Sequence, residues 1–276
     1  MTEDDPFTRR LNATGFLLQL ALEEEIRARA IATGTGAFSV PFDSCEREVP
    51  WRDPVTGDEG YLDLVIRRRG VFFLFECKRT KPEHDWLFLV RKRDHAQASG
   101  TVLCNQPRHA SPSWVHAKIE PAAPVSEFVS IHGEGGDRPK NGRMLERDAG
   151  QLVKALRGFA SEEFERPTTE DPPAFVPVIV TTARLKIRLY EAEELSVADG
   201  TLPPGEFVEV PWVMFKKPLT VHTWPTGLKG NRSELRFHRE PTIFVATAAS
   251  VADLFMGLHV GTELVKHTPQ STAVSR

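Results

Sequence analysis

Two short apolar segments joined by a basic turn constrain the fold of this 276-residue chain more than any other stretch. Residues 61–66 and 71–77 are rich in the aliphatic and aromatic side chains that favour strands, and the RRRG sequence between them ends in glycine. This order is typical of two antiparallel strands joined by a tight turn. The sequence therefore predicts a β-hairpin over residues 61–77.

The register of this hairpin decides which side chains meet. If the loop is centred on Arg69 and Gly70, Asp63 lies across from Glu76, and alternation along the strands puts Asp63, Glu76 and Lys78 on one face. An odd-length loop or a bulge would break this parity. The opposite face would carry an apolar set that packs on a core: Leu62, Leu64, Ile66, Val71, Phe73, Phe75 and Cys77.

Like charges directly opposite on a hairpin are destabilising, so Asp63 and Glu76 need a neutralising partner. A hard divalent cation suits them, because Mg²⁺ prefers one or two carboxylates together with water and phosphate oxygens. Lys78 would add a positive charge that orients or helps to deprotonate a water, or that stabilises a phosphoryl group. The alternative is a surface ion pair between Glu76 and Lys78 beside an unrelated Asp63. We favour the site, because the charged residues interrupt the apolar run VFFLFECK.

Asp63 followed by Glu76-Cys77-Lys78 resembles the signature of the PD-(D/E)XK nuclease superfamily, the restriction-endonuclease-like fold. The resemblance implies that Asp63 and Glu76 are metal ligands, that the backbone carbonyl of Cys77 is a third ligand, and that Lys78 is the catalytic lysine. The implied activity is metal-dependent phosphodiester hydrolysis. The chain departs from the pattern at Leu62, where the name of the motif has proline.

The resemblance covers residues 11–80 and, more loosely, 143–180. It implies an α/β fold with a three-layer core, in which helices flank a mixed central sheet and insertions decorate it. The sequence fits this order, with a helix at 12–31 and a strand at 45–51 before the hairpin. An amphipathic helix at 143–166 and a continuous apolar strand at 174–181 follow. Pro177 places that last strand near an edge or at a bulge.

The first helix contains the next candidate. Nucleases of this type often carry an acidic residue here that reaches the metal site, and Glu24 falls on a stripe with Leu17, Leu20, Ala21, Ala28 and Ile31 at helical spacing. Related proteins also share a TG-aromatic-x-L-E opening, which TGFLL matches up to Gln19. If the acid belongs there, this chain has lost it. Glu24 could equally belong to a solvated acidic cluster that pairs with the following arginines.

The helix at 143–166 supplies one further candidate by resemblance. In these nucleases the helix after the lysine strand often offers a glutamine or lysine to the active site, and Gln151 lies close to the apolar stripe. The alternative is that Gln151 is an exposed helix residue.

The length suits one substantial α/β domain. We expect a core over residues 1–181 with an insertion at about 81–142, and a C-terminal extension or small lobe over 182–276. Within this last part, strands at 207–215 and 242–246, a short helix at 250–258 and a disordered tail from about 268 are predicted.

Composition narrows the function classes. A net charge of −3 gives no global basic field of the kind that nucleic-acid-coating proteins have, although an enzyme needs only a local basic rim. Three cysteines without a CxxC pair indicate reduced thiols, and neither a signal peptide nor an apolar run of membrane-spanning length is visible. No zinc spacing, nucleotide-binding glycine motif or GxSxG elbow occurs. We therefore expect a soluble, cytoplasmic protein.

The sequence thus predicts a nuclease dependent on Mg²⁺ or Mn²⁺. The resemblance implies DNA rather than RNA as its substrate, and by analogy a setting such as bacterial restriction or phage defence. Its oligomeric state and any partner protein stay open. The alternative is a catalytically silent nucleic-acid-binding or regulatory module on the same fold, which the negative net charge and Gln19 keep in play.

Overall fold

The computed structural model describes residues 15–33, 43–68, 70–81, 84–105, 112–132, 142–165, 173–216 and 240–261. These residues form an α/β fold with a mixed, multi-stranded central sheet and few helices. The helices are α2 (Phe16–Thr33), α3 (Gly142–Glu165) and α5 (Val251–Gly257). The first strands in chain order are β1 (Ser44–Arg52), β2 (Glu59–Arg68), β3 (Val71–Lys78), β4 (Asp85–Arg91), β5 (Gln97–Cys104), β6 (Ser113–Ala123), β7 (Val125–Ser126) and β8 (Phe128–His132). They are followed by β9 (Ala174–Thr181), β10 (Arg184–Tyr190), β11 (Val208–Val210), β12 (Trp212–Lys216), β13 (Thr242–Thr247) and β14 (His259–Gly261).

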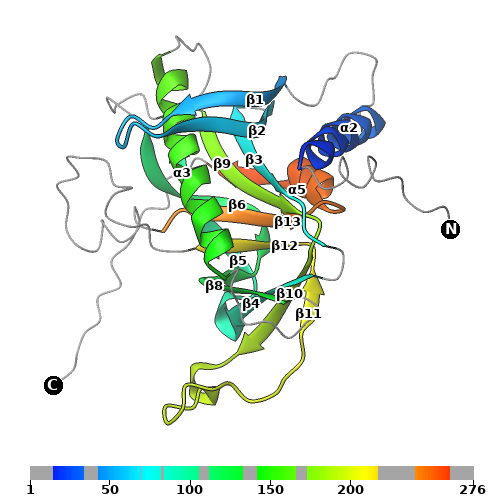
Figure 1. The fold of residues 1–276 in the computed structure, drawn as a ribbon, viewed down its shortest axis with the longest axis vertical. Coiled ribbons are helices and arrows are strands. Elements are labelled where there is room, and N and C mark those ends of the chain that lie inside the picture. The colour runs from blue at the N-terminus through cyan, green and yellow to red at the C-terminus, as the bar shows by residue number, and fades with distance from the viewer. Residues whose placement is uncertain are drawn as a thin grey trace.

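The strands form two sheets (Figure 1). The larger has the order β1-β2-β3-β9-β13-β12-β7, and β5, β6 and β14 attach beside β9. Strands β3, β9 and β13 run parallel, while β1, β2 and β3 are antiparallel, so the sheet is mixed. The smaller sheet has the order β11-β10-β4-β8.

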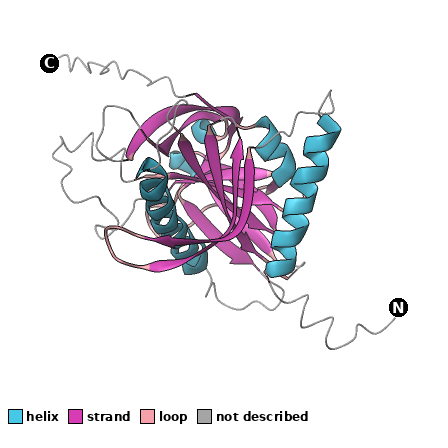
Figure 2. Ribbon diagram, turned by 90° about the horizontal axis from the view of Figure 1, so that it is seen from above, coloured by secondary structure: helices cyan, strands magenta, loops and turns pink. Residues whose placement is uncertain are grey.

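The longer helices α2 and α3 lie on opposite sides of the strands (Figure 2). The α3 side holds one hydrophobic cluster, which includes Val65, Phe72 and Leu74 from the hairpin. The α2 side holds a second cluster, to which the same strands contribute Phe73 and Phe75. Both faces of the hairpin are therefore buried, which explains why its sequence is almost continuously apolar.

The hairpin has the predicted register. Arg68 pairs with Val71 and Leu64 pairs with Phe75, which is the predicted pairing; of the two residues between the strands, the structure describes Gly70. Gly70 has φ +75°, a left-handed conformation that glycine adopts without a steric penalty. The expected strands and helices around it occur close to their predicted bounds, although residues 12–14 of the expected first helix lie outside the described residues.

The expectation that Pro177 marks an edge or a bulge is wrong. Strand β9 lies inside the sheet, with β3 on one side and β5 and then β13 on the other. The N–H groups of Ala174 and Thr182 donate toward β3, so residues of odd number direct their nitrogens to the other side. On that side the partner changes from β5, which ends opposite Phe175, to β13, which begins opposite Val178. Pro177 falls in this gap, where no N–H is needed.

The parts predicted as an insertion and a C-terminal extension contribute strands to both sheets. Strands β12 and β13 join the large sheet, whereas β4, β8, β10 and β11 form the small one. The strand predicted at 207–215 is two strands, β11 and β12, with Pro211 between them. The predicted tail from 268 lies outside the described residues. No helix in the described ranges has the length and apolarity needed to cross a membrane.

Helix α3 is fixed to the loop between β1 and β2. The buried Asp53 forms an ion pair with the buried Arg157, and Asp58 pairs with Lys154 at 2.7 Å. Gly158 lies against the backbone of Arg52, where a β-carbon would come within 2.6 Å of the carbonyl oxygen. These contacts set the position of the helix over the hairpin.

Candidate active site

The pairing of the hairpin ends just before the predicted carboxylate pair. Leu64–Phe75 is its last pair, and beyond it the N–H of Cys77 donates to Oδ2 of Asp63 at 2.6 Å. On the other neighbouring strand, Glu48 has φ 49°, so β1 is also irregular at the position opposite Asp63. Beyond the last backbone pair, the Asp63 carboxylate therefore accepts the hydrogen bond of the β3 backbone and links the two strands.

Because β2 is irregular at Asp63, Leu62 lies on the other face of the sheet from the one predicted. Leu62 was expected on the same face as Leu64, but Leu62 packs in the cluster under α3 and Leu64 in the cluster under α2. The strict alternation behind that expectation fails where the strand is distorted at Asp63. From Leu64 onward the alternation holds.

Strand β3 brings the other two predicted residues to the α3 side. Glu76 and Lys78 continue the alternation of Phe72 and Leu74, which pack under α3. The Nζ of Lys78 lies 2.7 Å from Oε1 of Glu76. The Cys77 side chain, between them, is buried in the cluster on the α2 side.

Helix α3 adds a carboxylate that the sequence analysis missed. Asp148 is 5% exposed, and its Oδ2 lies 3.5 Å from Nζ of Lys78. Its Oδ1 lies 3.5 Å from Nε of the neighbouring, largely exposed Arg147. A signal for it exists in the sequence, because Asp148 falls on the apolar stripe of Leu145 and Leu152 at spacings of three and four residues.

Burial makes both predicted carboxylates reluctant to ionise. Desolvation raises the pKa of Asp63, against the hydrogen bond from Cys77 and the charge of Lys78, which lower it. Desolvation also raises the pKa of Glu76, and the negative charge of Asp63 raises it further. The two carboxylates thus interact with each other, and Lys78 compensates them only in part.

Lys78 is held as an ammonium group. Burial acts to lower its pKa, but the hydrogen bond and charge of Glu76 and the charge of Asp148 outweigh burial, so the pKa of Lys78 is raised overall. A lysine flanked by two carboxylates keeps its proton at neutral pH. It can therefore stabilise negative charge or donate a proton, but it is a poor acceptor.

The first helix presents Gln19 to the site, and Glu24 points elsewhere. Gln19 is 2% exposed, and its Nε2 donates to the backbone carbonyl of Asp63. Glu24 is exposed, as are Ala21 and Ala28 of the stripe on which it was placed. The buried stripe runs instead through Gln19, Leu22 and Ile26. The apolar residues of this helix surround most of its circumference, so their spacing did not identify the buried side.

Gln151 is also exposed, and the structure places Asp148 at the site instead. These two residues are three positions apart on α3, so the predicted helix contacts Lys78 through Asp148 and not through Gln151. Lys154 follows Gln151 by three positions on α3. It pairs with Asp58 in the loop between β1 and β2.

The donor set matches a hard cation. Asp63 and Glu76 offer carboxylate oxygens, and the carbonyl of Cys77 faces the same side as its N–H, toward Asp63. The described residues contain no group of three or more His, Cys, Asp and Glu side chains that could hold a metal ion. Two carboxylates completed by a carbonyl, water and substrate oxygens are the arrangement that Mg²⁺ tolerates and that zinc sites do not use. The residues present therefore fit Mg²⁺ or Mn²⁺.

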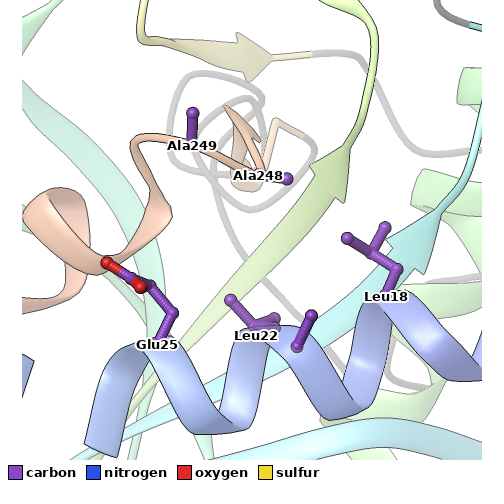
Figure 3. Close-up of a pocket in the computed structure, with 6 residues that line it drawn as sticks. Leu18, Leu22, Glu25, Ala248 and Ala249 are labelled. Carbon is purple, nitrogen blue, oxygen red and sulfur yellow. The ribbon is translucent and has the colours of Figure 1, made fainter. Parts of the chain in front are cut away.

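A small pocket lies on the α2 side of the sheet, the side opposite to Glu76 and Lys78 (Figure 3). It has a volume of about 350 Å³ and lies between α2 and the turn after β13. That turn is joined to β9 by a hydrogen bond from the N–H of Ala248 to the carbonyl of Thr181, the residue that pairs with Lys78. The pocket is lined by Leu18, Ala21, Leu22, Glu25, Ala248 and Ala249. The carboxyl ends of parallel strands, where it lies, are the usual location of ligand sites in α/β sheets.

Comparison with known proteins identifies no relative, since no protein-family model, no curated protein and no solved structure matches the chain. The assignment of a function therefore depends on the geometry of Asp63, Glu76, Lys78 and Asp148.

Proposed function

We propose that the protein is a metal-dependent nuclease of the restriction-endonuclease-like class, with Asp63, Glu76 and Lys78 as its catalytic residues. The observation that carries this proposal is the convergence of two desolvated carboxylates and one ammonium where the pairing of a hairpin ends. A surface ion pair would not require three partly or fully buried charged groups within one cluster. Groups with perturbed pKa values gather at functional sites more often than elsewhere.

The charge of the cluster supports a cation. Asp63, Glu76 and Asp148 carry three negative charges when ionised, and Lys78 carries one positive charge. A divalent cation would bring the sum to zero, whereas the exposed Arg147 at the rim contributes little in water. Asp63 and Glu76 would hold the ion, together with the carbonyl of Cys77. When bound, Mg²⁺ or Mn²⁺ supplies Lewis-acid chemistry toward a phosphodiester oxygen.

The other steps belong to the side chains of this chain. A water attacks phosphorus in line with the leaving oxygen and gives up a proton to solvent. The bond from phosphorus to the leaving oxygen breaks, and that oxygen takes up a proton from solvent. Lys78, an ammonium held beside Glu76, stabilises the negative charge that develops on the phosphoryl oxygens and helps to orient the water. Gln19 and Asp148 hold the backbone of Asp63 and the Lys78 side chain in place.

DNA is the proposed substrate. The test is cleavage of single-stranded DNA, double-stranded DNA and RNA in Mg²⁺, Mn²⁺ or EDTA, with Glu76→Gln and Lys78→Met as variants. Glu162→Gln is the matched control, because Glu162 is an exposed carboxylate of α3. Cleavage that needs the metal, survives in the control and is lost in both site variants would support the proposal. Cleavage that persists in folded Glu76→Gln would refute it.

One observation favours a second candidate, a catalytically silent module that binds nucleic acid. Gln19 occupies the buried helix position at which nucleases of the resembled class often have an acid, and its amide is engaged with the carbonyl of Asp63. Nucleic-acid binding that is unaffected by Mn²⁺ and by Asp63→Asn, without cleavage, would support this module. Binding that tightens with Mn²⁺ only when Asp63 is present would support the nuclease.

A further inference from the structure

Asp148 has an unusual environment for a helix carboxylate. It lies in the first part of α3 and is 5% exposed, and its buried Oδ2 accepts no hydrogen bond from the residues that the structure describes, with Nζ of Lys78 3.5 Å away. A buried carboxylate oxygen left in this state is costly, so a role for it is expected. The helix cannot easily move to relieve it, because the Asp53–Arg157 ion pair and the close approach of Gly158 to Arg52 fix α3 to the sheet.

Of the two cations near Asp148, Lys78 matters more. The side chain of Arg147 is 71% exposed, so its attraction to Oδ1 at 3.5 Å is screened by water. Lys78 is partly buried between Glu76 and Asp148, and its Nζ lies 2.7 Å from Glu76 but 3.5 Å from Asp148. The ammonium thus lies closer to Glu76, and its ion pair with Asp148 is the longer of the two.

A divalent cation would change this balance. The ion and the ammonium would compete for the single negative charge of the Glu76 carboxylate. The two positive charges would also repel each other, so the attraction between Lys78 and Glu76 would weaken. Asp148 is a buried carboxyl group outside the proposed ligand set, and its Oδ2 already lies 3.5 Å from the ammonium.

We propose that Asp148 is a positioning residue, which takes over the ammonium of Lys78 from Glu76 when a divalent cation engages Glu76. This inference rests on the proposed function, since it requires the cation. It assigns Lys78 two positions, one on Glu76 without the ion and one on Asp148 with it. Asp148 thereby promotes cation binding without being a ligand, because it removes a competitor from Glu76.

The test is a double-mutant cycle on the affinity for Mn²⁺ alone, measured by titration calorimetry without substrate. Asp148→Asn should weaken Mn²⁺ binding about tenfold when Lys78 is present, because the ammonium then stays on Glu76. With Lys78→Met the competitor is absent, so the same change should cost less than about threefold. Lys78→Met alone should tighten binding. Glu162→Gln should leave the affinity unchanged, and Asp148→Ser replaces Asp148→Asn if the latter does not fold.

The outcomes separate the two proposals. If Asp148→Asn weakens Mn²⁺ binding by the same factor with Lys78 and with Lys78→Met, Asp148 acts on the ion directly. The proposed transfer of the ammonium from Glu76 to Asp148 (the handover) is then refuted, while the nuclease proposal stands. The handover is also refuted, and the nuclease proposal also stands, if Asp148→Asn changes Mn²⁺ binding in neither case. If the unmodified protein does not bind Mn²⁺, the proposed function itself fails, and the handover fails with it.

Discussion

The carboxylate of Asp63 accepts a hydrogen bond of 2.6 Å from the backbone N–H of Cys77, the residue between Glu76 and Lys78. This bond joins the two strands where their regular pairing has ended. It fixes Asp63 relative to the other two site residues through the backbone, so the three groups hold their geometry without help from a flexible loop. Sites built on strands in this way are positioned more accurately than sites on loops.

The first prediction concerns stability against pH in EDTA. The pKa of Glu76 is raised in the folded protein, so folding favours its protonated form. This contribution is fully present below the unfolded pKa of about 4.3 and is lost as the pH rises through the higher folded value. Glu76→Gln removes the effect. From acidic to neutral pH, the free energy of unfolding of this variant should therefore rise relative to that of the unmodified protein. Urea unfolding at several pH values measures this, and a constant difference would contradict it.

The second prediction concerns the stabilisation by cations. An ion that binds only the folded state at one hundred times its dissociation constant adds about 2.7 kcal/mol to the free energy of unfolding. We expect Mn²⁺ to raise the melting temperature of the unmodified protein and of Glu162→Gln. Asp63→Asn removes a proposed ligand, so its melting temperature should be the same in Mn²⁺ and in EDTA. A full Mn²⁺ response in Asp63→Asn would place the ion elsewhere.

The third prediction concerns Gln19. Gln19→Glu replaces the amide that donates to the carbonyl of Asp63 with an acceptor and adds a negative charge near Asp63. In EDTA this should lower the free energy of unfolding by about 1–3 kcal/mol. A cation should recover part of the loss, because it offsets the added charge. Urea unfolding with and without Mn²⁺ measures both effects, and an equal loss in the two conditions would show that Gln19 lies too far from the ion.

The fourth prediction uses two glycines of α3. A β-carbon at Gly158 would lie 2.6 Å from the carbonyl oxygen of Arg52, whereas one at Gly150 would meet nothing within 4 Å. Gly158→Ala should therefore destabilise the protein by about 1–3 kcal/mol through overpacking. Gly150→Ala should stabilise it by about 0.5–1 kcal/mol, because alanine is the better helix former. Thermal unfolding of both variants is the measurement, and similar effects would refute the close approach.

The fifth prediction concerns the ion pair between Asp53 and Arg157. Both side chains are buried, so Asp53→Asn removes the carboxylate that pairs with the guanidinium and should cost about 3–5 kcal/mol of stability. Asp58→Asn, at an exposed pair with Lys154, should change stability little. Adding Arg157→Met to Asp53→Asn should recover part of the loss in urea unfolding. No recovery would mean that Asp53 acts through its loop contacts to Val55 and Thr56.

The hairpin was predictable because its register depends on local sequence. The turn requires a residue such as Gly70 in a left-handed conformation, and the apolar runs on both sides fix the pairing. The distortion at Asp63 was not predictable from the hairpin alone, because it coincides with an irregular Glu48 in the strand that pairs from the other side. A pattern that alternates within one strand contains no information on such a neighbour.

The helices show a different limit. On α3 the apolar stripe stands out from a charged background, so the helix was assigned correctly and Asp148 could have been found on its buried side. On α2 apolar residues cover most of the circumference, and Glu24 was assigned to a side that faces solvent. The helix also packs against α5, which comes from the far end of the chain, and no local pattern reveals that contact.

The two parallel strands that end at the site continue together into the small sheet. Strands β3 and β9 are neighbours up to Lys78 and Thr181, and the segments that follow them pair again as β4 and β10. Between the two sheets, the hydroxyl of Thr182 accepts from the N–H of Thr80 at 2.9 Å and donates to its carbonyl at 3.0 Å. A chain that ended at Thr181 would lack Thr182, and with it the two hydrogen bonds to Thr80, which lies two residues after Lys78. The chain therefore offers no safe truncation point there, and a fragment that keeps the arrangement around Lys78 should retain the small sheet.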